Sequence, residues 1–338
     1  MLCITLPAYT EDEALVTEGS TECDYTLDLD SAEFEDRVRT TMSVPLENAR
    51  NAVRALGELI RPKQWVKNSF VMVGMLFSRN WGHMELLLKS ITATIAFCFV
   101  SSAVYVLNDY FDRERDRMHP KKCHRPLAAG TVTPRVAGGI FLFFLLIGVL
   151  LGFAVSSIAV GILFYYLTQN IAYSKGLKQV VLLDVLLIAF GFMLRILMGT
   201  WGVGITPSKW LLLSGLTLAL FMGFGKRWAE LNELLTGASA HRPVLKNYSL
   251  ERLNQLLKIT AGAVILTYSL YVIDPSTVML HHTTTLIYTV PFVTYGLWRY
   301  LYLIRIGKGG DPSKLVTKDP HIIIAVLLWL TSVLYILS

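Results

Sequence analysis

Long apolar runs alternate with short polar stretches along most of this chain. Nine apolar segments follow one another, most of them close to the roughly 20 residues that a helix needs to cross a bilayer. They cover residues 66–78, 86–107, 135–154, 156–173, 180–199, 209–225, 256–273, 285–303 and 320–337. The first is short unless it extends back through Gln64. The pattern predicts an all-α, polytopic membrane protein with nine transmembrane helices.

The stretch before these segments has a different character. Residues 1–36 contain eleven acidic residues and no Lys or Arg, and they lack the charged start and apolar core of a signal peptide. We expect an acidic, disordered tail over 1–43 and a transmembrane domain over 44–338. Apolar residues at helical spacing over 46–60 predict an amphipathic helix on the membrane surface, with a soluble helix in the tail as the alternative.

Composition supports the membrane assignment and limits the classes of molecule that the protein is expected to bind. Hydrophobic residues make up 53% of the 338 residues and charged residues 17%, against about 25% charged in soluble domains. After the acidic tail, the rest of the chain holds all 31 Lys and Arg residues. This charge suits a membrane surface or an anionic substrate, and the hydropathy disfavours nucleic acid. The four cysteines lie far apart and predict neither a disulfide framework nor a zinc site.

The basic residues also predict the orientation in the membrane. Of the Lys and Arg residues in the alternating loops, 24 fall on one side and only Arg79 falls on the other. The positive-inside rule therefore places the N-terminus and the long loops in the cytoplasm. With nine spans, the C-terminus faces outward.

An acidic motif follows the second apolar segment. Asp109, Asp112 and Asp116 fall within about 60° of one another on a helix, and three carboxylates so close stay ionised only with cations between them. Oxygen ligands beside substrate phosphates are typical of Mg²⁺ sites. The cations Arg117, Lys122 and Arg125 follow within ten residues and could hold phosphate oxygens.

The alternative for this stretch is a solvated loop with ordinary charged pairs along a helix, such as Asp109 with Arg113. Its position argues against that interpretation. The acids begin two residues past an apolar segment, where a carboxylate drawn toward the bilayer centre would cost about 2.5–3.5 kcal/mol. The motif therefore indicates a metal-diphosphate site.

Four motifs carry a resemblance to a known family. The acidic motif, Asn108-Asp109-x-x-Asp112-x-x-x-Asp116 followed by Arg125-Pro-Leu-Ala-x-Gly130, resembles the first aspartate-rich motif of the UbiA superfamily of intramembrane prenyltransferases. Three more resemble its decaprenyl-phosphate phosphoribosyltransferase branch, over about 55–338 and in the same order. They are Arg61-Pro-Lys-Gln64-Trp65-Val-Lys67-Asn68, Tyr173-Ser-x-Gly-Leu-Lys178 and Gly225-Lys226-Arg227-x-x-Glu230-Leu.

The resemblance implies a fold, a reaction and a set of site residues. It implies a nine-helix bundle with a cytoplasmic-facing cavity, in which 5-phosphoribosyl 1-diphosphate binds through Mg²⁺ and phosphoribose passes to a polyprenyl phosphate. Asp109, Asp112 and Asp116 would be the catalytic and metal-binding residues. The substrate-binding residues would be Asn108, Arg117, Lys122, Arg125, Tyr173, Lys178, Lys67, Lys226, Arg227 and Glu230.

The chain departs from other UbiA enzymes in a way that supports this branch. Users of prenyl diphosphates carry a second motif with several aspartates, whereas this chain has Lys178 and the single acid Asp184. One acidic motif fits one diphosphate substrate, and a lipid monophosphate is better met by cations at helix ends. Those cations are Arg61, Lys63, Lys67, Lys226 and Arg227, unless they serve only topology and lipid contact.

Arg195 lies inside an apolar segment, where an ionisable side chain usually faces a cavity or a partner. Asp184 is about three helical turns away on the same predicted helix, so it is a poor partner. Either an acid elsewhere or a substrate accounts for Arg195. Two other functions stay open: a UbiA prenyltransferase that moves an isoprenoid to an aromatic acceptor, and a polytopic transporter.

Overall fold

The structure is a computed structural model, which describes residues 52–338 except 120–121, 236–244, 246–247, 309–314 and 338. The acidic tail and the start of the predicted surface helix lie outside the described residues. Within them, every regular element is a helix, and residues 52–60 are helical as the amphipathic pattern predicts. The all-α prediction is therefore confirmed for this part of the chain.

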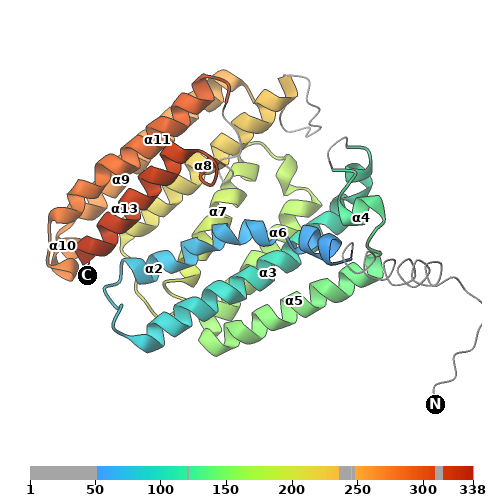
Figure 1. Cartoon of the computed structure of the whole chain (residues 1–338), viewed down its shortest axis with the longest axis horizontal. Coiled ribbons are helices and arrows are strands. Elements are labelled where there is room, and N and C mark those ends of the chain that lie inside the picture. The colour runs from blue at the N-terminus through green and yellow to red at the C-terminus, as the bar shows by residue number, and fades with distance from the viewer. Residues whose placement is uncertain (1–51, 120–121, 236–244, 246–247, 309–314, 338) are drawn as a thin grey trace, which may run out of the picture. The chain divides into compact units, whose positions relative to one another are not determined.

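Helices follow one another with short connections (Figure 1). The elements after residues 52–60 are η1 (Pro62–Met72), α2 (Val73–Leu76), α3 (Met84–Arg117), α4 (Pro126–Ala129), α5 (Pro134–Val155), α6 (Ser157–Lys175), η2 (Leu177–Gln179), α7 (Leu183–Met198), α8 (Lys209–Leu235), α9 (Leu250–Ile273), α10 (Pro275–His281), η4 (Thr285–Thr289), α11 (Val290–Arg305) and α13 (Pro320–Leu337).

Side-chain caps explain several of the sharp boundaries. The Thr133 hydroxyl accepts the Val136 N–H at the start of α5, and the Ser249 hydroxyl accepts the Arg252 N–H at the start of α9. Ser156 ends α5 and begins α6, because its extended backbone breaks the first helix and its hydroxyl caps the second. These caps satisfy N–H groups that have no partner inside a helix.

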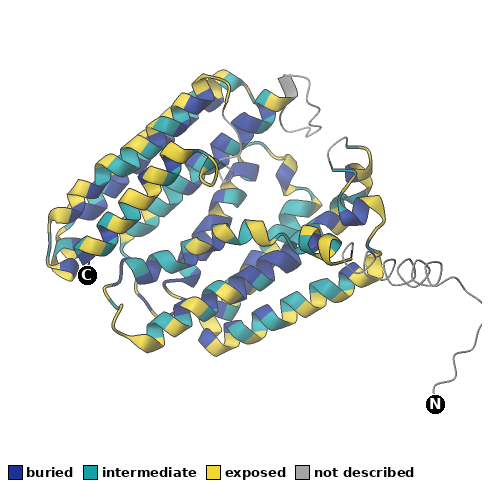
Figure 2. Cartoon of the chain, viewed as in Figure 1, coloured by how far each residue is buried: buried dark blue, intermediate teal, exposed yellow. Residues whose placement is uncertain are grey.

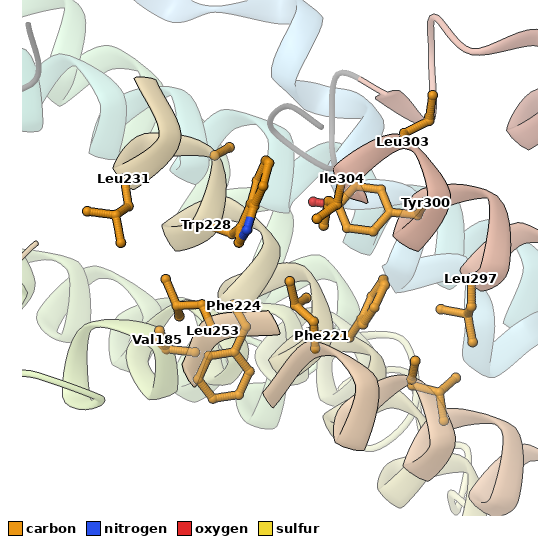
Figure 3. Close-up of a cluster of buried hydrophobic side chains, with 14 of the residues drawn as sticks. Val185, Phe221, Phe224, Trp228, Leu231, Leu253, Leu297, Tyr300, Leu303 and Ile304 are labelled. Carbon is orange, nitrogen blue, oxygen red and sulfur yellow. The ribbon is translucent and has the colours of Figure 1, made fainter. Parts of the chain in front are cut away.

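The helices pack in two neighbourhoods. In the first half of the chain, α3 packs along α5 and also contacts α6 and η1. In the second half, α8 packs on α7 and α9, and α11 packs on α13. Figure 3 shows the core of the second half, where Phe221 and Trp228 of α8 lie near Tyr300 and Ile304 of α11, and Phe224 belongs to the same cluster.

Many apolar side chains face outward. Along α5, Leu142, Phe143, Leu146, Leu150 and Phe153 are each more than half exposed, and Figure 2 shows mixed exposure on the outer helices. Such a surface is unfavourable in water and ordinary in lipid. Among the described residues, four helices are long and apolar enough to cross a membrane: Met84–Arg117, Pro134–Val155, Leu250–Ile273 and Pro320–Leu337.

Each of the nine predicted apolar segments overlaps a described helix, but the count of nine spans stays a prediction. Helices α7 and α11 have 16 residues each, which at 1.5 Å per residue gives about 24 Å. The first apolar segment departs most from expectation, because it lies in η1, an 11-residue 3-10 helix, and the short α2. A 3-10 helix rises about 2 Å per residue, so η1 covers more length than an α-helix would.

Two glycines let η1 and α2 lie directly against the end of α7. A Cβ at Gly199 would lie 1.6 Å from the Val71 carbonyl oxygen, and one at Gly74 would lie 2.0 Å from the Gly199 carbonyl oxygen. No side chain larger than hydrogen fits at either position. This backbone contact fixes η1 beside α7 and positions the residues described next.

Candidate active site

The acidic motif lies on the last turns of α3. The helix continues without a break from the apolar segment through Asp109, Asp112 and Asp116, so the three acids share the face that their spacing predicts. Asp109 and Asp116 are buried, with exposed fractions of 2% and 4%, whereas Asp112 is half-buried. Buried carboxylates at a helix end require cationic or hydrogen-bonding partners.

Three basic side chains from three other segments meet these acids. Arg125 donates from Nη1 to Asp109 Oδ1 at 3.0 Å and to Asp116 Oδ2 at 2.7 Å. Arg61 donates to the same Asp109 oxygen at 2.5 Å, and Lys178 Nζ donates to Asp112 Oδ1 at 2.6 Å. The structure thus brings together two predicted cations of the acidic site, Arg125 and Lys178. It also places Arg61 there, although the sequence grouped Arg61 with the cations expected for the lipid phosphate.

Local backbone geometry aims each of these cations. Arg61 has a φ of 52° and a ψ of 60°, a left-handed conformation that turns the chain from the first helix into η1. Arg125 immediately precedes Pro126, which begins α4, so the Arg-Pro-Leu-Ala motif is a short helical turn. Lys178 lies in η2, and beside it the Ser174 hydroxyl donates to Asn108 Oδ1 at 2.5 Å.

The acids offer the oxygen ligands that Mg²⁺ prefers. Asp109 Oδ2 is buried and has no hydrogen-bond partner, so one carboxylate oxygen is available in the centre of the motif. Within the described part of the chain, no three carboxylate, histidine or cysteine side chains converge as a metal cluster. This geometry is compatible with Mg²⁺, which commonly binds one or two carboxylates and completes its shell with substrate phosphates and water.

The other predicted cations near the motif have different surroundings. Arg117 Nη1 donates to Glu114 at 2.9 Å and its Nε donates to the Ala128 carbonyl at 3.2 Å, so it ties α3 to α4. Lys122 lies in the turn between these helices and is half-buried. Tyr173, also half-buried, precedes Ser174 on the last turns of α6. Lys226 is half-buried on α8 and makes no ion pair with another described residue.

Arg227 belongs to a second, closed charged cluster. Its Nη1 lies 3.2 Å from Asp184 Oδ2 and 2.8 Å from Glu230 Oε2, and the Arg227 and Asp184 side chains are both 0% exposed. The Tyr248 hydroxyl donates to Asp184 Oδ1 at 2.8 Å and accepts the Leu182 N–H at 2.8 Å. Burial is the main reason that the pKa of Tyr248 lies well above its usual value, so this hydroxyl keeps its proton.

Arg195 lies in the bundle interior without an acidic partner among the described ion pairs. Its guanidinium donates to Asn68 Oδ1 at 2.8 Å and to the Gly191 carbonyl at 2.7 Å, and it lies 4.8 Å from the centre of the Phe97 ring. Asn68 in turn donates to Ser101 Oγ on α3 at 3.2 Å. The sequence left two kinds of partner open for Arg195, an acid elsewhere in the chain or a substrate. The described residues contain no acid that pairs with it.

Sequence reasoning missed Tyr248 and the role of Asn68. Tyr248 stands in a polar stretch before α9, with no spacing that links it to Asp184, which is 64 residues away. Asn68 is the last residue of the motif that begins at Arg61, and its place in that motif was the signal that the sequence offered for its role. Its contacts with α3 and α7 arise only in the folded chain.

Comparison with known proteins agrees with this geometry. Residues 68–334 match the sequence profile described as the UbiA prenyltransferase family. The chain belongs to the UbiA prenyltransferase family. As a UbiA protein whose described helices include four that can cross a bilayer, it is an integral membrane protein.

This UbiA protein has similar relatives along most of its length. A protein of Corynebacterium glutamicum named decaprenyl-phosphate phosphoribosyltransferase is 33% identical over 290 residues, which are 83% of this chain and 86% of the relative. A protein of the same name from Mycolicibacterium smegmatis is 27% identical over 315 residues, or 90% of this chain and 98% of the relative.

Solved UbiA structures share its fold. A UbiA homologue from Archaeoglobus fulgidus, bound to DMAPP and Mg²⁺, superposes with a TM-score of 0.63 at 17% identity. The superposition covers 84% of this UbiA chain and 99% of the homologue. It supports the arrangement of helices described above.

Proposed function

We propose that this protein transfers 5-phosphoribose from 5-phosphoribosyl 1-diphosphate to a polyprenyl phosphate of the decaprenyl type and releases diphosphate. One observation carries the proposal. A single acidic motif on α3 is surrounded by Arg61, Arg125 and Lys178, while half-buried Lys226 lies on a different helix, α8. One diphosphate site with cations elsewhere suits a diphosphate donor and a monophosphate acceptor. The names of the relatives support the same reaction.

Asp109, Asp112 and Asp116 would hold Mg²⁺, with the partnerless Asp109 Oδ2 as the first ligand oxygen. The bound ion would neutralise part of the diphosphate charge. The solved homologue that is bound to Mg²⁺ supports the use of a divalent ion in this fold. Arg125 and Lys178, which contact the acids, are positioned to turn toward phosphate oxygens when the donor binds.

The reaction needs charge neutralisation more than proton transfer. An oxygen of the lipid phosphate attacks the anomeric carbon of the ribose, and the bond from that carbon to the diphosphate oxygen breaks with its electron pair. The attacking phosphate is already anionic at neutral pH, so no general base is required. Donors that meet the leaving diphosphate lower the barrier. We assign that role to Arg117, Lys122, Arg125 and Lys178, and the orientation of a ribose hydroxyl or an aspartate to Asn108.

The orientation in the membrane is part of the proposal. The excess of Lys and Arg in alternating loops supports a cytoplasmic N-terminus and active site, an outward C-terminus and nine spans. The acidic motif then opens toward the cytoplasm, where the water-soluble donor is found. The lipid acceptor reaches the site from the bilayer.

A solved homologue binds DMAPP, an isoprenyl diphosphate, so the experiment must also test an alternative reaction: transfer of an isoprenoid to an aromatic acceptor. The purified protein in detergent is given Mg²⁺, polyprenyl phosphate and radiolabelled 5-phosphoribosyl 1-diphosphate, and label is followed into the lipid fraction. Label in a lipid that carries ribose phosphate supports the proposal. No label in the lipid, with prenylation of an aromatic acceptor from an isoprenyl diphosphate, would reject it.

A further inference from the structure

The 3-10 geometry of η1 divides its side chains into three faces. In a 3-10 helix, side chains three residues apart lie directly above one another. Lys63, Val66 and Ser69 form one row, and all three are exposed. Gln64, Lys67 and Phe70 form a second row, and all three are half-buried. The third row is Trp65, Asn68 and Val71, which becomes fully buried after the first residue. An α-helix would not keep these rows separate.

Contacts show what each row faces. The third row packs on α3, where Trp65 Nε1 donates to Ser102 Oγ at 2.9 Å and Asn68 donates to Ser101 Oγ. The second row turns toward α7, because the Phe70 ring meets the Phe192 ring edge-on with centroids 5.2 Å apart. Lys67 lies one turn before Phe70 on this row, and Gln64 lies one turn before Lys67. The exposed row of Lys63 faces away from both helices.

The interior beside η1 carries a positive charge, which contacts this helix through Asn68 of the third row. Arg195 of α7 is 5% exposed, and its hydrogen-bond partners, the Asn68 amide, the Gly191 carbonyl and the Tyr166 hydroxyl, are all neutral. No carboxylate forms an ion pair with Arg195 in the described ranges. A cation held in a low-dielectric interior strongly favours a nearby anion. The bound anion of a working enzyme would supply that missing charge.

The depth of the second row suits an acceptor that comes from the bilayer. Arg61, at the start of η1, contacts Asp109 and marks the level of the acidic motif. At about 2 Å per residue, Gln64 lies about 6 Å and Lys67 about 12 Å farther along η1. The contact of Trp65 with Ser102 agrees, because Ser102 precedes Asp109 by seven residues, or about 10 Å of α-helix. The flexible Lys67 side chain can reach back toward the motif.

We infer that Gln64 and Lys67, with the charge of Arg195 behind them, form a second anion subsite that binds the phosphate of the polyprenyl acceptor. This inference rests on the proposed function and names the residues for its second substrate. The Lys67 ammonium and the Gln64 amide donate hydrogen bonds to phosphate oxygens that do not attack. No proton changes place in this step. Lys63, one residue before Gln64, belongs to the exposed row. Of the two roles that the sequence left open for it, this position favours topology and lipid contact over phosphate binding, so Lys63 lies outside the subsite.

Matched variants on neighbouring rows test the subsite. Lys67→Ala should raise the KM for polyprenyl phosphate about ten- to a hundredfold, the loss expected for one charged hydrogen bond. Gln64→Ala should raise it a few-fold, and the control Lys63→Ala should leave it within twofold. The KM for 5-phosphoribosyl 1-diphosphate should stay within twofold in all three. Equal effects of Lys63→Ala and Lys67→Ala, or an effect on the donor alone, would overturn the inference.

A binding measurement separates this inference from the proposed reaction. Native mass spectrometry of the full chain, without donor, would compare a polyprenyl phosphate with the polyprenol of the same length. Wild type and Lys63→Ala should retain the phosphate lipid preferentially, and Lys67→Ala should lose that preference. If wild type keeps the preference but never transfers phosphoribose, the proposed reaction fails and the subsite stands. If Lys67→Ala keeps it while the wild type transfers phosphoribose, only the subsite fails.

Arg195 acts through its charge, so it is a positioning residue in this arrangement. Arg195→Lys should keep the preference for the phosphate lipid at least in part, because it retains the positive charge. Arg195→Gln should weaken it, with little change in donor KM. Equal preference in Arg195→Gln and wild type would remove Arg195 from the subsite and leave the Lys67 result as its test.

Discussion

Two charged clusters differ in exposure, although Lys178 of the first and Asp184 of the second are only six residues apart in the sequence. Around the acidic motif, the side chains of Arg61, Arg125 and Asp112 are 27%, 29% and 28% exposed, and the other two acids and Lys178 are more deeply buried. In the closed cluster, Arg227 and Asp184 are both 0% exposed. The same kinds of side chain therefore face different surroundings: one cluster can exchange its partners for a ligand, and the other cannot.

Energetics explain the difference. A partly exposed cation can leave a carboxylate and bind a phosphate, because water and the new partner compensate for the lost contact. A buried cation that loses its acid stays uncompensated in a low-dielectric medium, at a cost of about 3–5 kcal/mol. The predicted role of Arg227 in binding substrate directly therefore requires an opening that its burial does not provide. We expect Arg227 to support the fold around the site instead.

The largest effect should come from the acidic motif. Asp109→Asn should lower phosphoribosyl transfer by at least about a hundredfold, because it removes a ligand charge that counters the growing charge of the diphosphate. Initial rates at saturating Mg²⁺ measure the loss. Glu85→Gln is the matched control, since Glu85 lies on the same helix but is exposed and pairs with Lys89 near the other end of α3. Activity of Asp109→Asn within threefold of wild type would remove the motif from the site.

The closed cluster should respond through stability. Arg227→Met or Asp184→Asn should lower the free energy of unfolding by about 3–5 kcal/mol, because each leaves one buried charge without its partner. Unfolding in detergent measures this change. The exposed pair Arg54 and Glu58, 3.1 Å apart, gives the control, and Glu58→Gln should change stability little. A stable Arg227→Met with a raised KM for lipid phosphate would instead make Arg227 a substrate ligand.

A smaller effect should link the two clusters. Tyr248 holds Leu182 and Asp184 beyond the turn that carries Lys178. Tyr248→Phe should raise the KM for 5-phosphoribosyl 1-diphosphate about three- to tenfold, the loss of about one neutral hydrogen bond. In a protein that already carries Lys178→Ala, Tyr248→Phe should cause no further increase of this KM. If the two effects multiply instead, Tyr248 does not act through Lys178.

Tyr268→Phe is the control for this prediction. The Tyr268 hydroxyl also has two partners, Thr289 at 2.7 Å and Trp329 at 2.9 Å, but these lie on η4 and α13 rather than beside Lys178. Its removal should lower stability and leave both KM values unchanged. A shift in donor KM equal to that of Tyr248→Phe would mean that the loss of a buried hydroxyl acts nonspecifically.

The smallest effect should come from the acidic tail. Deletion of residues 2–36 should leave the kinetic constants within twofold, because the stretch has no basic residue to hold a phosphate and few apolar residues to bury. Rates are compared after normalising for inserted protein. Loss of turnover in a well-inserted truncation would assign the tail a part in catalysis.

Periodicity and length predicted much of the fold. Every apolar segment overlaps a helix, and the boundaries of α5 and α13 agree with the predicted segments within a residue. The 3-10 geometry of η1 could not be predicted, because it depends on contacts with α3 and α7 and on the approach of Gly74 and Gly199. Helical spacing gives information only about the segment that carries it, whereas these contacts join segments that are far apart in the sequence.

In the candidate site, too, the sequence predicted the local arrangement but not the contacts between distant segments. The shared face of Asp109, Asp112 and Asp116 follows from their spacing and is present in α3. The difference between adjacent Lys226 and Arg227 could not be read from the sequence, because both stand in one basic motif. Only the fold places Asp184 against Arg227 and leaves Lys226 half-buried.

The length of α3 has a consequence for how the enzyme senses its membrane. Its 34 residues extend about 51 Å, well beyond a hydrocarbon layer of about 30 Å. The membrane-spanning part and the acids belong to one continuous helix. Hydrophobic mismatch that tilts this helix therefore also moves the end that carries the acids. We therefore expect the height of the acids above the bilayer, and with it donor binding, to depend on acyl-chain length.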